Sequence, residues 1–270
     1  ASIYSGLKQH HNAIQYLDKA LKIFLASKGN EFGIALTYAN LGDAYFEAND
    51  EELGKVPLSK TEKYNKSLWN LEQSLKYAEK IEDNFSLLAN VYQTKGNIYN
   101  AIGKKELAEE SYQKSVNYYA ERTAKKEYAS SVLSLANFYI ADSQYTKAEP
   151  LVAEVIQIGN QNKIPSLQRD GYLALTTLNE KQGKYNEALN NFRDYILFKE
   201  QIFNQEKEKE ITRKQLQLDF SIKEKDYQTK QQLTNLELDK QVLLVKRRQQ
   251  ELLLNQQQLA LSDKEKNIQR

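Results

Sequence analysis

The stretch Leu135-Ala-Asn-Phe-Tyr-Ile recurs in altered form as Lys95-Gly-Asn-Ile-Tyr-Asn and as Leu41-Gly-Asp-Ala-Tyr-Phe. Each copy has a small residue, alanine or glycine, in its second position and a tyrosine three positions later. Residues three or four apart lie on the same face of an α-helix. The recurring stretch therefore predicts a helix in every repeat, with a small residue and a tyrosine on one face.

A second small residue follows the first after twelve positions in the later copies. The pairs are Gly96 with Ala108, Ala136 with Ala148, and Thr176 with Ala188, which gives a period of 40 residues. Two antiparallel helices can approach closely where small residues face each other, and a neighbouring tyrosine can fill the space beside that contact. The pattern predicts a stack of helical hairpins.

The first full copy departs from this period. Gly42 and Ser67 take the same two roles but lie 25 residues apart, so thirteen extra residues are inserted around positions 50–62. Long loops on repeat scaffolds can complete a binding site, and they can also have no function. Ala13 and Ala20 indicate an earlier hairpin whose first helix would precede Ala1.

The second helices read Glu106-Leu-Ala-Glu-Glu-Ser-Tyr, Tyr145-Thr-Lys-Ala-Glu-Pro-Leu and Tyr185-Asn-Glu-Ala-Leu-Asn-Asn-Phe. With the first helices, they resemble the tetratricopeptide repeat (TPR) family over roughly residues 1–200. The resemblance implies an all-α superhelix of about five hairpins. Two departures are the period near 40, against about 34 in the family, and Asn179, where an aromatic residue is expected. Longer periods are typical of peptide-binding TPR groups such as kinesin light chain and the Rap-type regulators.

Helix-breaking residues support the same division of the chain. Gly29, Gly103, Gly159 and Gly183 fall where turns are expected, and Pro165 falls where a helix should begin. All ten glycines and all three prolines precede residue 184. A continuous helix over 184–270 would be about 130 Å long. We predict a TPR domain over 1–198 and one long helix over 199–270.

The long helix carries a partial heptad pattern. Leu238, Val245, Leu252 and Leu259 recur every seven residues, with Val242 between the first two. Further apolar residues lie on another face, and Gln249 and Gln256 occupy positions that a stable zipper would fill with leucine. Two interpretations remain open, a weak parallel homodimer through residues 199–270 and a solvated helix.

Composition indicates a binding protein and argues against an enzyme. Lys and Arg number 38 against 36 Asp and Glu, which gives no electrostatic reason to expect nucleic acid. The absence of Cys excludes thiolate chemistry, and no apolar run is long enough to enter a membrane. His10 and His11 point about 100° apart on a helix, so we expect a solvated pair and no metal or cofactor site. We expect Trp69 to pack in the core.

A binding surface can be predicted on the first helices, which line the concave face in the TPR family. The residues flanking the packing seam there are mostly Asn, Gln and acids: Asn40, Asp43, Glu47, Asn90, Gln93, Asn97, Asn100, Ser134, Asn137, Thr177 and Glu180. Amide side chains can donate to and accept from a peptide backbone. In the family, Asn at the places of Asn97 and Asn137 does this. The alternative is that these are ordinary polar residues on an exposed face.

The junction between the repeats and the long helix carries a second resemblance. The stretch Tyr185-Asn-Glu-Ala-Leu-Asn-Asn-Phe-Arg-Asp-Tyr-Ile-Leu-Phe-Lys-Glu-Gln-Ile-Phe-Asn resembles the sensor region of TPR-containing sensor histidine kinases of Bacteroidetes-type bacteria. A sister architecture ends in a helix-turn-helix regulator domain. The kinase resemblance implies a periplasmic sensor. Its output domain would lie beyond Arg270, since the chain has no histidine after residue 11 and no ATP-binding motif.

The main interpretation is a sensor or adaptor that relays binding through the long helix, as the sensor part of a histidine kinase. Two alternatives stay open, a cytoplasmic TPR scaffold that only joins proteins and the sensory part of a helix-turn-helix transcriptional regulator. The chain contains no Met, even at position 1. We therefore expect it to be a piece of a longer protein.

Overall fold

The computed structural model describes residues 10–27, 30–49, 58–120 and 124–268, with side chains described up to residue 258. Every regular element in these ranges is an α-helix, which confirms the predicted all-α class. The helices are α2 (His10–Ala26), α3 (Glu31–Glu47), α4 (Lys60–Ala78), α5 (Phe85–Ala101), α6 (Lys105–Ala120), α7 (Lys125–Ala141), α8 (Tyr145–Gln161), α9 (Pro165–Lys181) and α10 (Tyr185–Ile268).

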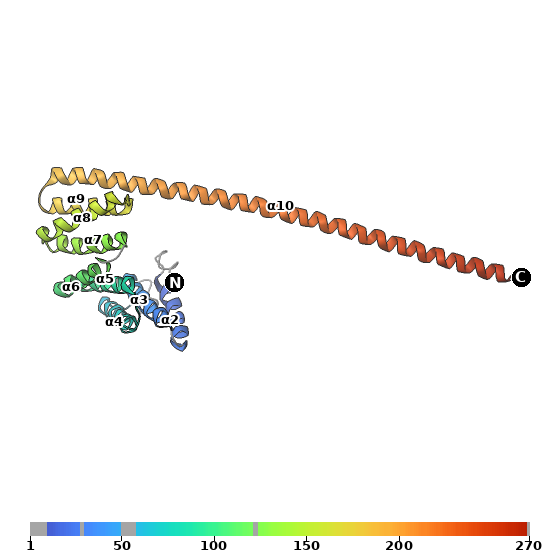
Figure 1. Ribbon diagram of the computed structural model, residues 1–270, viewed down its shortest axis with the longest axis horizontal. Coiled ribbons are helices and arrows are strands. Elements are labelled where there is room, and N and C mark those ends of the chain that lie inside the picture. Colours follow the sequence, from blue (N-terminus) through green and yellow to red (C-terminus); the bar gives the residue numbers. More distant parts are fainter. Residues whose placement is uncertain (1–9, 28–29, 50–57, 121–123, 269–270) are drawn as a thin grey trace. The chain divides into compact units, whose positions relative to one another are not determined.

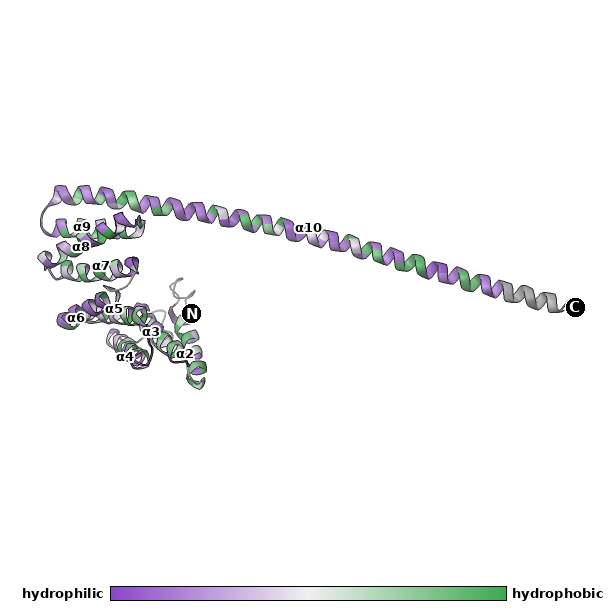
Figure 2. Ribbon diagram, in the orientation of Figure 1, coloured by the Kyte–Doolittle hydropathy of each residue, from purple (hydrophilic) through white to green (hydrophobic). Residues whose placement is uncertain are grey.

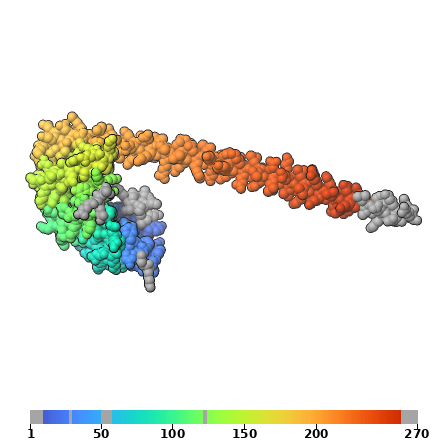
Figure 3. All heavy atoms as spheres, in the orientation of Figure 1, coloured from blue at the N-terminus to red at the C-terminus, as the bar shows by residue number. Residues whose placement is uncertain are grey.

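The helices pair into hairpins that stack in sequence order (Figure 1). The full pairs are α3 with α4, α5 with α6, and α7 with α8, and a ring contact between Tyr172 and Phe198 joins α9 to the start of α10. The first helices α5, α7 and α9 begin at residues 85, 125 and 165, so the predicted period of 40 is confirmed. In the space-filling view the successive hairpins are in close contact (Figure 3).

The predicted insertion at 50–62 is only partly visible. Residues 50–57 lie outside the described part of the chain. The last three residues of the insertion, 60–62, are the first turn of α4 and not part of a loop. Ser59 caps this helix: its hydroxyl accepts from the Glu62 N–H at 3.2 Å, and the Glu62 carboxylate accepts from the Ser59 N–H at 2.9 Å. This reciprocal pair satisfies two backbone donors at the helix start.

Four turns between helices share one backbone motif. Gly103, Ser143, Lys163 and Gly183 each follow a helix end with φ between 53° and 76°. After α5, the Lys104 N–H donates to the Tyr99 carbonyl at 2.9 Å and the Gly103 N–H donates to the Asn100 carbonyl at 3.1 Å. These two bonds define a Schellman motif and satisfy the last carbonyls of the helix.

Gly159 was predicted to lie in a turn, and this is wrong. It lies inside α8, where an added Cβ would be 3.1 Å from the Gln168 backbone nitrogen and 3.2 Å from the Leu167 Cβ. Gly159 therefore allows α8 and α9 to approach closely. Gly29, also predicted to mark a turn, lies outside the described residues.

The small residues of each hairpin do create a close helix–helix contact. The Ser67 hydroxyl donates to the Gly42 carbonyl at 2.6 Å, and Ala108, Ala136 and Ala148 are fully buried. The atoms nearest the glycines differ from those expected, however. A Cβ on Gly42 would lie 2.6 Å from the Leu71 side chain, and one on Gly96 would lie 2.8 Å from the Tyr112 ring. The residue four positions after the second small residue therefore occupies the space.

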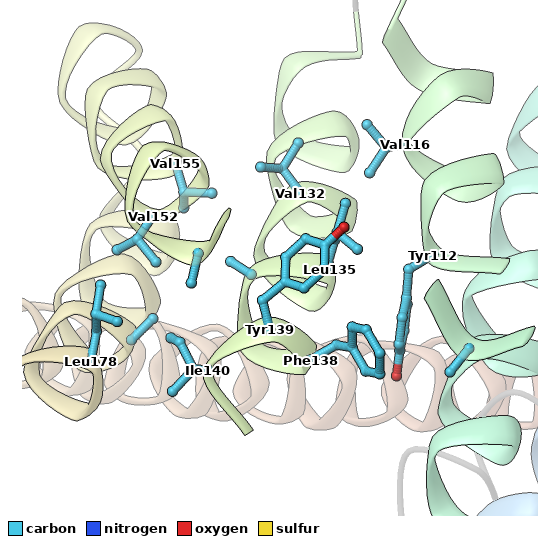
Figure 4. Packing of buried hydrophobic residues seen from close by; sticks show 14 residues of the cluster. Tyr112, Val116, Val132, Leu135, Phe138, Tyr139, Ile140, Val152, Val155 and Leu178 are labelled. Carbon is cyan, nitrogen blue, oxygen red and sulfur yellow. The ribbon is translucent and has the colours of Figure 1, made fainter. Parts of the chain in front are cut away.

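The largest core cluster joins α6, α7, α8 and α9 (Figure 4). Val132 and Val152 are fully buried there, and Tyr139 lies beside them as its position three after Ala136 predicts. Tyr45 and Tyr99, expected to play the same part, are only half-buried. Two smaller clusters fill the spaces among α2, α3, α4 and α5.

Trp69 was expected in the core, and the structure shows otherwise. Its side chain is 54% exposed on α4, with its ring edge-on to Tyr38 at a centroid distance of 6.0 Å. Trp69 therefore contacts the partner helix α3 at its edge while most of its ring area stays open to solvent.

A stacked aromatic pair recurs in three hairpins. The pairs are Tyr38 with Tyr77, Tyr92 with Tyr118, and Tyr172 with Phe198, at centroid distances of 5.9, 5.7 and 5.7 Å and interplanar angles of 24°, 15° and 12°. In each pair the first ring lies four residues before the first small residue of its hairpin. The second ring lies ten residues after the second one. Each pair joins the two helices of its hairpin.

The chain divides into two compact units, residues 1–203 and 204–270. Helix α10 begins within the first unit and continues through the second. In the second unit every described side chain is exposed, and apolar residues alternate with polar ones along the helix (Figure 2). No helix in the described residues has a stretch that is both long and apolar enough to cross a bilayer. Dimerisation through residues 199–270 stays a prediction.

Candidate functional site

The first helices of the hairpins form one continuous layer. Helix α3 contacts α5, α5 contacts α7, and α7 contacts α9. The Thr94 hydroxyl donates to the Asp43 carboxylate at 2.6 Å between α5 and α3, and the Ser131 hydroxyl reaches the Gln93 side-chain oxygen at 3.4 Å between α7 and α5. All the predicted binding residues lie on these four helices.

One row of this layer has a residue from every hairpin. Asp43, Asn97, Asn137 and Thr177 each follow directly after the first small residue of the seam. Asn137 is exposed, and the other three are half-buried. The helices of packed pairs lie about 8–10 Å apart. An extended chain advances about 3.3 Å per residue, so three such steps match a segment of roughly eight or nine residues.

The side chain of Asn97 forms a hydrogen bond within the fold and is also partly exposed to solvent. The Tyr112 hydroxyl donates to the Asn97 side-chain oxygen at 2.8 Å. Burial raises the pKa of Tyr112 to about 12, so the phenol stays protonated and remains a donor at neutral pH. Because this bond uses the carbonyl end of Asn97, its NH₂ group is the end that can donate to a ligand.

Asn90 and Gln93 form longer, weaker hydrogen bonds to neighbouring helices. The Tyr119 hydroxyl approaches the Asn90 side-chain oxygen at 3.4 Å, and Gln93 accepts from Ser131 at the same distance. Thr177 is less suited to a ligand than predicted, because its hydroxyl donates to the Leu173 carbonyl at 3.0 Å. Asn40, Asn100 and Asn137 are exposed. The predicted set therefore divides into amides tied to the fold and amides that face solvent.

Asp43 is the most perturbed acid of the layer. Burial raises its pKa to about 6; the hydrogen bond from Thr94 opposes the shift, and the nearby Glu47 carboxylate adds to it. A carboxylate that is costly to ionise and lies on an open helix layer is a candidate functional group.

Two apolar residues on α3 were missed by the sequence reasoning. Phe32 is 53% exposed and Leu36 is 39% exposed. Phe32, Leu36, Asn40, Asp43 and Glu47 are three or four positions apart, so they lie in one stripe along α3. The first half of this stripe is apolar and its last half is acidic. The spacing of four between Phe32, Leu36 and Asn40 was a signal that could have revealed this stripe.

His10 was predicted to be solvated, and this is wrong. Only 5% of the residue is exposed, at the start of α2. Its Nδ1 has no hydrogen-bond partner and is 3.9 Å from a Glu47 carboxylate oxygen. His11 is within hydrogen-bond distance of the Gln15 amide, at 2.9 Å. Among the described residues, no group of three His, Asp or Glu is arranged to hold a metal ion.

Comparisons with known proteins agree with this architecture. A family model described as tetratricopeptide repeat matches residues 1–25 and 89–122, so the chain contains TPR repeats. No curated protein matches the chain in sequence.

Solved structures share the fold. The crystal structure of BtubC (BKLC) from P. vanneervenii has a TM-score of 0.59 and 15% sequence identity, over 74% of this chain and 77% of that one. A Podosopora anserina protein related to kinesin light chain, with nearly identical TPR-like repeats, has a TM-score of 0.55 and 18% identity, over 74% and 92% of the two chains. The likeness at this identity is one of fold alone.

Proposed function

We propose that this chain is a protein-binding module that holds an extended segment of its partner along the first helices α3, α5, α7 and α9. The observation that carries the proposal is the row of Asp43, Asn97, Asn137 and Thr177, one residue per hairpin on a continuous layer. Polar groups at a regular spacing suit the regularly spaced amides of an extended backbone. The described residues offer this surface for binding, and we propose no catalytic role.

The magnitudes indicate what each part of the surface contributes. A net hydrogen bond is worth about 0.5–1.5 kcal/mol, so four hydrogen bonds, one from each residue of the row, give at most about 6 kcal/mol. A micromolar complex needs about 8 kcal/mol. Contact with the exposed Phe32 and Leu36 side chains would supply the remainder through burial of apolar surface. The polar row would then set the register of the segment, while the contact with Phe32 and Leu36 adds affinity.

A selected peptide tests the surface directly. Random twelve-residue peptides are selected on the full chain, and the dissociation constant of one binder is measured by calorimetry. We expect Asn40→Ala with Asn137→Ala to weaken binding about tenfold, the equivalent of two modest hydrogen bonds. Both residues are exposed, so the fold should not suffer.

The matched control is Asn117→Ala with Asn190→Ala, which removes two exposed amides from second helices. It should bind as the unmodified chain does. Equal affinity of the two double variants would reject the first-helix surface.

We further propose that the module is the sensor part of a two-component histidine kinase and relays binding through α10. Two observations support this: the resemblance at the junction, and the continuity of α10 from the last hairpin at Tyr185 to Ile268. A ligand can shift such a helix only if it binds one arrangement better than another. Hydrogen exchange should then change within 204–240 when peptide is added. Change confined to the first helices would favour the rival interpretation, a TPR scaffold that transmits nothing.

A further inference from the structure

The first part of α10, where it belongs to the last hairpin, has an apolar face that is largely exposed. Tyr185, Leu189 and Phe192 are 72%, 53% and 42% exposed, and Ile196 is half-buried. These four residues are spaced four, three and four positions apart, so they lie on one side of the helix. We call them the exposed face of α10. A helix gains stability when such a face is buried against another helix.

The same face of the preceding second helix is covered within the array. Phe192 and Ile196 follow Val152 and Ile156 of α8 by one repeat of 40 residues, so they take the equivalent positions. Val152 is fully buried, and an added Cβ on Gly171 of α9 would lie 2.7 Å from the Ile156 side chain. In α8 this face therefore packs against the first helix of the next hairpin. In α10 it stays exposed because the helix continues in place of a further hairpin.

The spacing of the exposed face continues into the heptad pattern of the tail. Six apolar residues of α10 fall in one series of seven-residue steps: Leu189, Ile196 and Phe203, and then Leu238, Val245 and Leu252. The two groups are separated by five such steps, with polar residues at the places between them. Residues seven apart stay on one side of a helix in a left-handed coiled coil. Both groups therefore fit one seam.

We propose that the exposed face of α10 packs against the same face of a second copy of this chain, with the two helices parallel and in register. The shared series favours a second copy, because a parallel copy presents apolar residues at the same seven-residue steps. From Tyr185 to Phe203 the series is only about 27 Å long, which is less than three heptads, and coiled coils are sustained over at least three or four. The exposed face therefore adds to dimerisation through the tail and does not replace it.

A second copy can reach this face without displacing α9. Ala188 is buried and Phe198 stacks on Tyr172, so these two residues mark the side of α10 that faces α9. At about 100° per residue, the exposed face lies roughly 110° around the helix from that side. Two α10 helices can therefore pair while each one keeps the contacts of its own hairpin.

Single cysteines test the pairing, since the chain has no Cys of its own. Leu189→Cys is in the exposed face, and Leu197→Cys is on the same helix outside it; the two leucines are 53% and 59% exposed. A disulfide needs Cα atoms within about 7 Å of each other, so only facing positions of a dimer form one readily. Under mild oxidation of the full chain, we expect Leu189→Cys to form covalent dimers at least about tenfold faster than Leu197→Cys.

A charge substitution measures what the exposed face contributes to the dimer. Leu189→Lys places two like charges opposite each other, so we expect the dissociation constant of the full-chain dimer to rise about tenfold in sedimentation. Leu197→Lys is the matched control and should leave the constant unchanged. Both substitutions change exposed side chains, so circular dichroism should show the helix content of the unmodified chain.

Each contrary outcome has a defined meaning. Equal cross-linking rates at positions 189 and 197 would reflect random collision and would overturn the proposal. Cross-linking of Leu238→Cys without cross-linking of Leu189→Cys would also overturn it, and would leave a dimer formed by the tail alone. Dimerisation unaffected by Leu189→Lys would show that the face is not part of the interface. A full chain that is monomeric at every concentration would overturn both this interface and the tail dimer. None of these readouts depends on peptide binding, so the proposed function is tested separately.

Discussion

At the scale of single residues, Asn97 connects the packing of a hairpin to the surface that we propose binds a peptide. Its side-chain oxygen accepts from Tyr112, whose ring fills the space beside Gly96. The amide can therefore face a ligand in a fixed orientation, because the buried phenol of the partner helix holds it. Several of the predicted binding residues form hydrogen bonds of this kind within the fold. Changing them therefore affects both the stability of the chain and its binding.

Gly96→Ala tests this connection. The new Cβ would lie 2.8 Å from the Tyr112 ring, and overpacking of this kind costs about 1–3 kcal/mol, more than the roughly 1 kcal/mol gained in helix propensity. Moving the ring also weakens its bond to Asn97. We expect the free energy of unfolding in urea to fall by about 1–2 kcal/mol. The exposed control Asn100→Ala on the same helix should change it by less than about 0.5 kcal/mol. An alanine at position 96 that costs no more than the control would contradict the close seam.

Asp43→Asn tests the acid by its pH dependence. The folded pKa is raised from 3.8 to about 6, so the acid's contribution to stability is present below pH 3.8 and is lost as the pH rises through 6. Asn stays neutral throughout. Relative to the variant, the unmodified chain should lose on the order of 2 kcal/mol of unfolding free energy between about pH 4 and pH 7. Parallel stability profiles of the two proteins in urea would show that Asp43 is not buried as described.

At the scale of elements, the recurring aromatic stack fixes the two helices of a hairpin to each other. In the last hairpin it joins Tyr172 of α9 to Phe198, which lies in the early part of the long helix α10. This contact lies within the first compact unit, which ends at Phe203. The stack therefore fixes the early part of α10 to the last hairpin of the repeat array.

A double-mutant cycle of Tyr172→Leu and Phe198→Leu should measure the stack. Aromatic pairs contribute about 0.5–1.5 kcal/mol beyond the burial of area, so we expect a coupling energy in that range. The readout is the opening free energy of α9 amides in native-state hydrogen exchange. The equivalent positions of the third hairpin, Val132 and Ile158, hold no aromatic pair, and a cycle of alanine substitutions there should give a smaller coupling. Equal coupling energies in the two cycles would mean that ring stacking adds no stability beyond ordinary apolar contact.

The elements themselves were predictable from the sequence, while several of their contacts were not. The period of 40 and the all-helical class follow from the small residues and the tyrosines, since these positions repeat along the chain. His10 lies 3.9 Å from Glu47, at the end of α3 and far along the chain, and sequence spacing carries no sign of this contact. Gly159 was misplaced because a glycine at a close helix contact and a glycine in a turn look alike in sequence.

The candidate site was predicted as a row, but its internal bonds were not. The positions of Asn97 and Asn137 follow from the repeat. The hydrogen bond from the Tyr112 hydroxyl to the Asn97 side-chain oxygen depends on the geometry of side chains from two helices, which the sequence does not give. Phe32 and Leu36 were not predicted because apolar residues on a helix are usually buried, although exposed apolar side chains also mark binding surfaces.

At the scale of the whole molecule, the chain combines a repeat array with a helix whose described side chains are all exposed beyond residue 203. Leu238, Val242, Val245 and Leu252 are each 46–63% exposed. A helix with this much exposed apolar surface gains stability by packing against another helix. The tail is therefore the part of the chain where we predict self-association.

Sedimentation of the full chain and of a chain ending at Phe203 should separate these roles. We expect the full chain to form a dimer as its concentration rises, and the shortened chain to stay monomeric. Val245→Lys should weaken the dimer because it places a charge in the heptad seam. Lys230→Gln, which changes an exposed residue outside that seam, is the control. A full chain that stays monomeric at the highest concentration would contradict the dimer.

The central claim is that the first-helix layer recognises the main chain of an extended segment. It is tested most directly by methylating, one at a time, the backbone nitrogens of the selected peptide and measuring each affinity by calorimetry. We predict that methylation at every second or third position weakens binding about tenfold, the loss of roughly one hydrogen bond, while alanine substitution of the same side chains changes it little. Affinities that depend on side chains alone and are unaffected by any backbone methyl group would contradict the account.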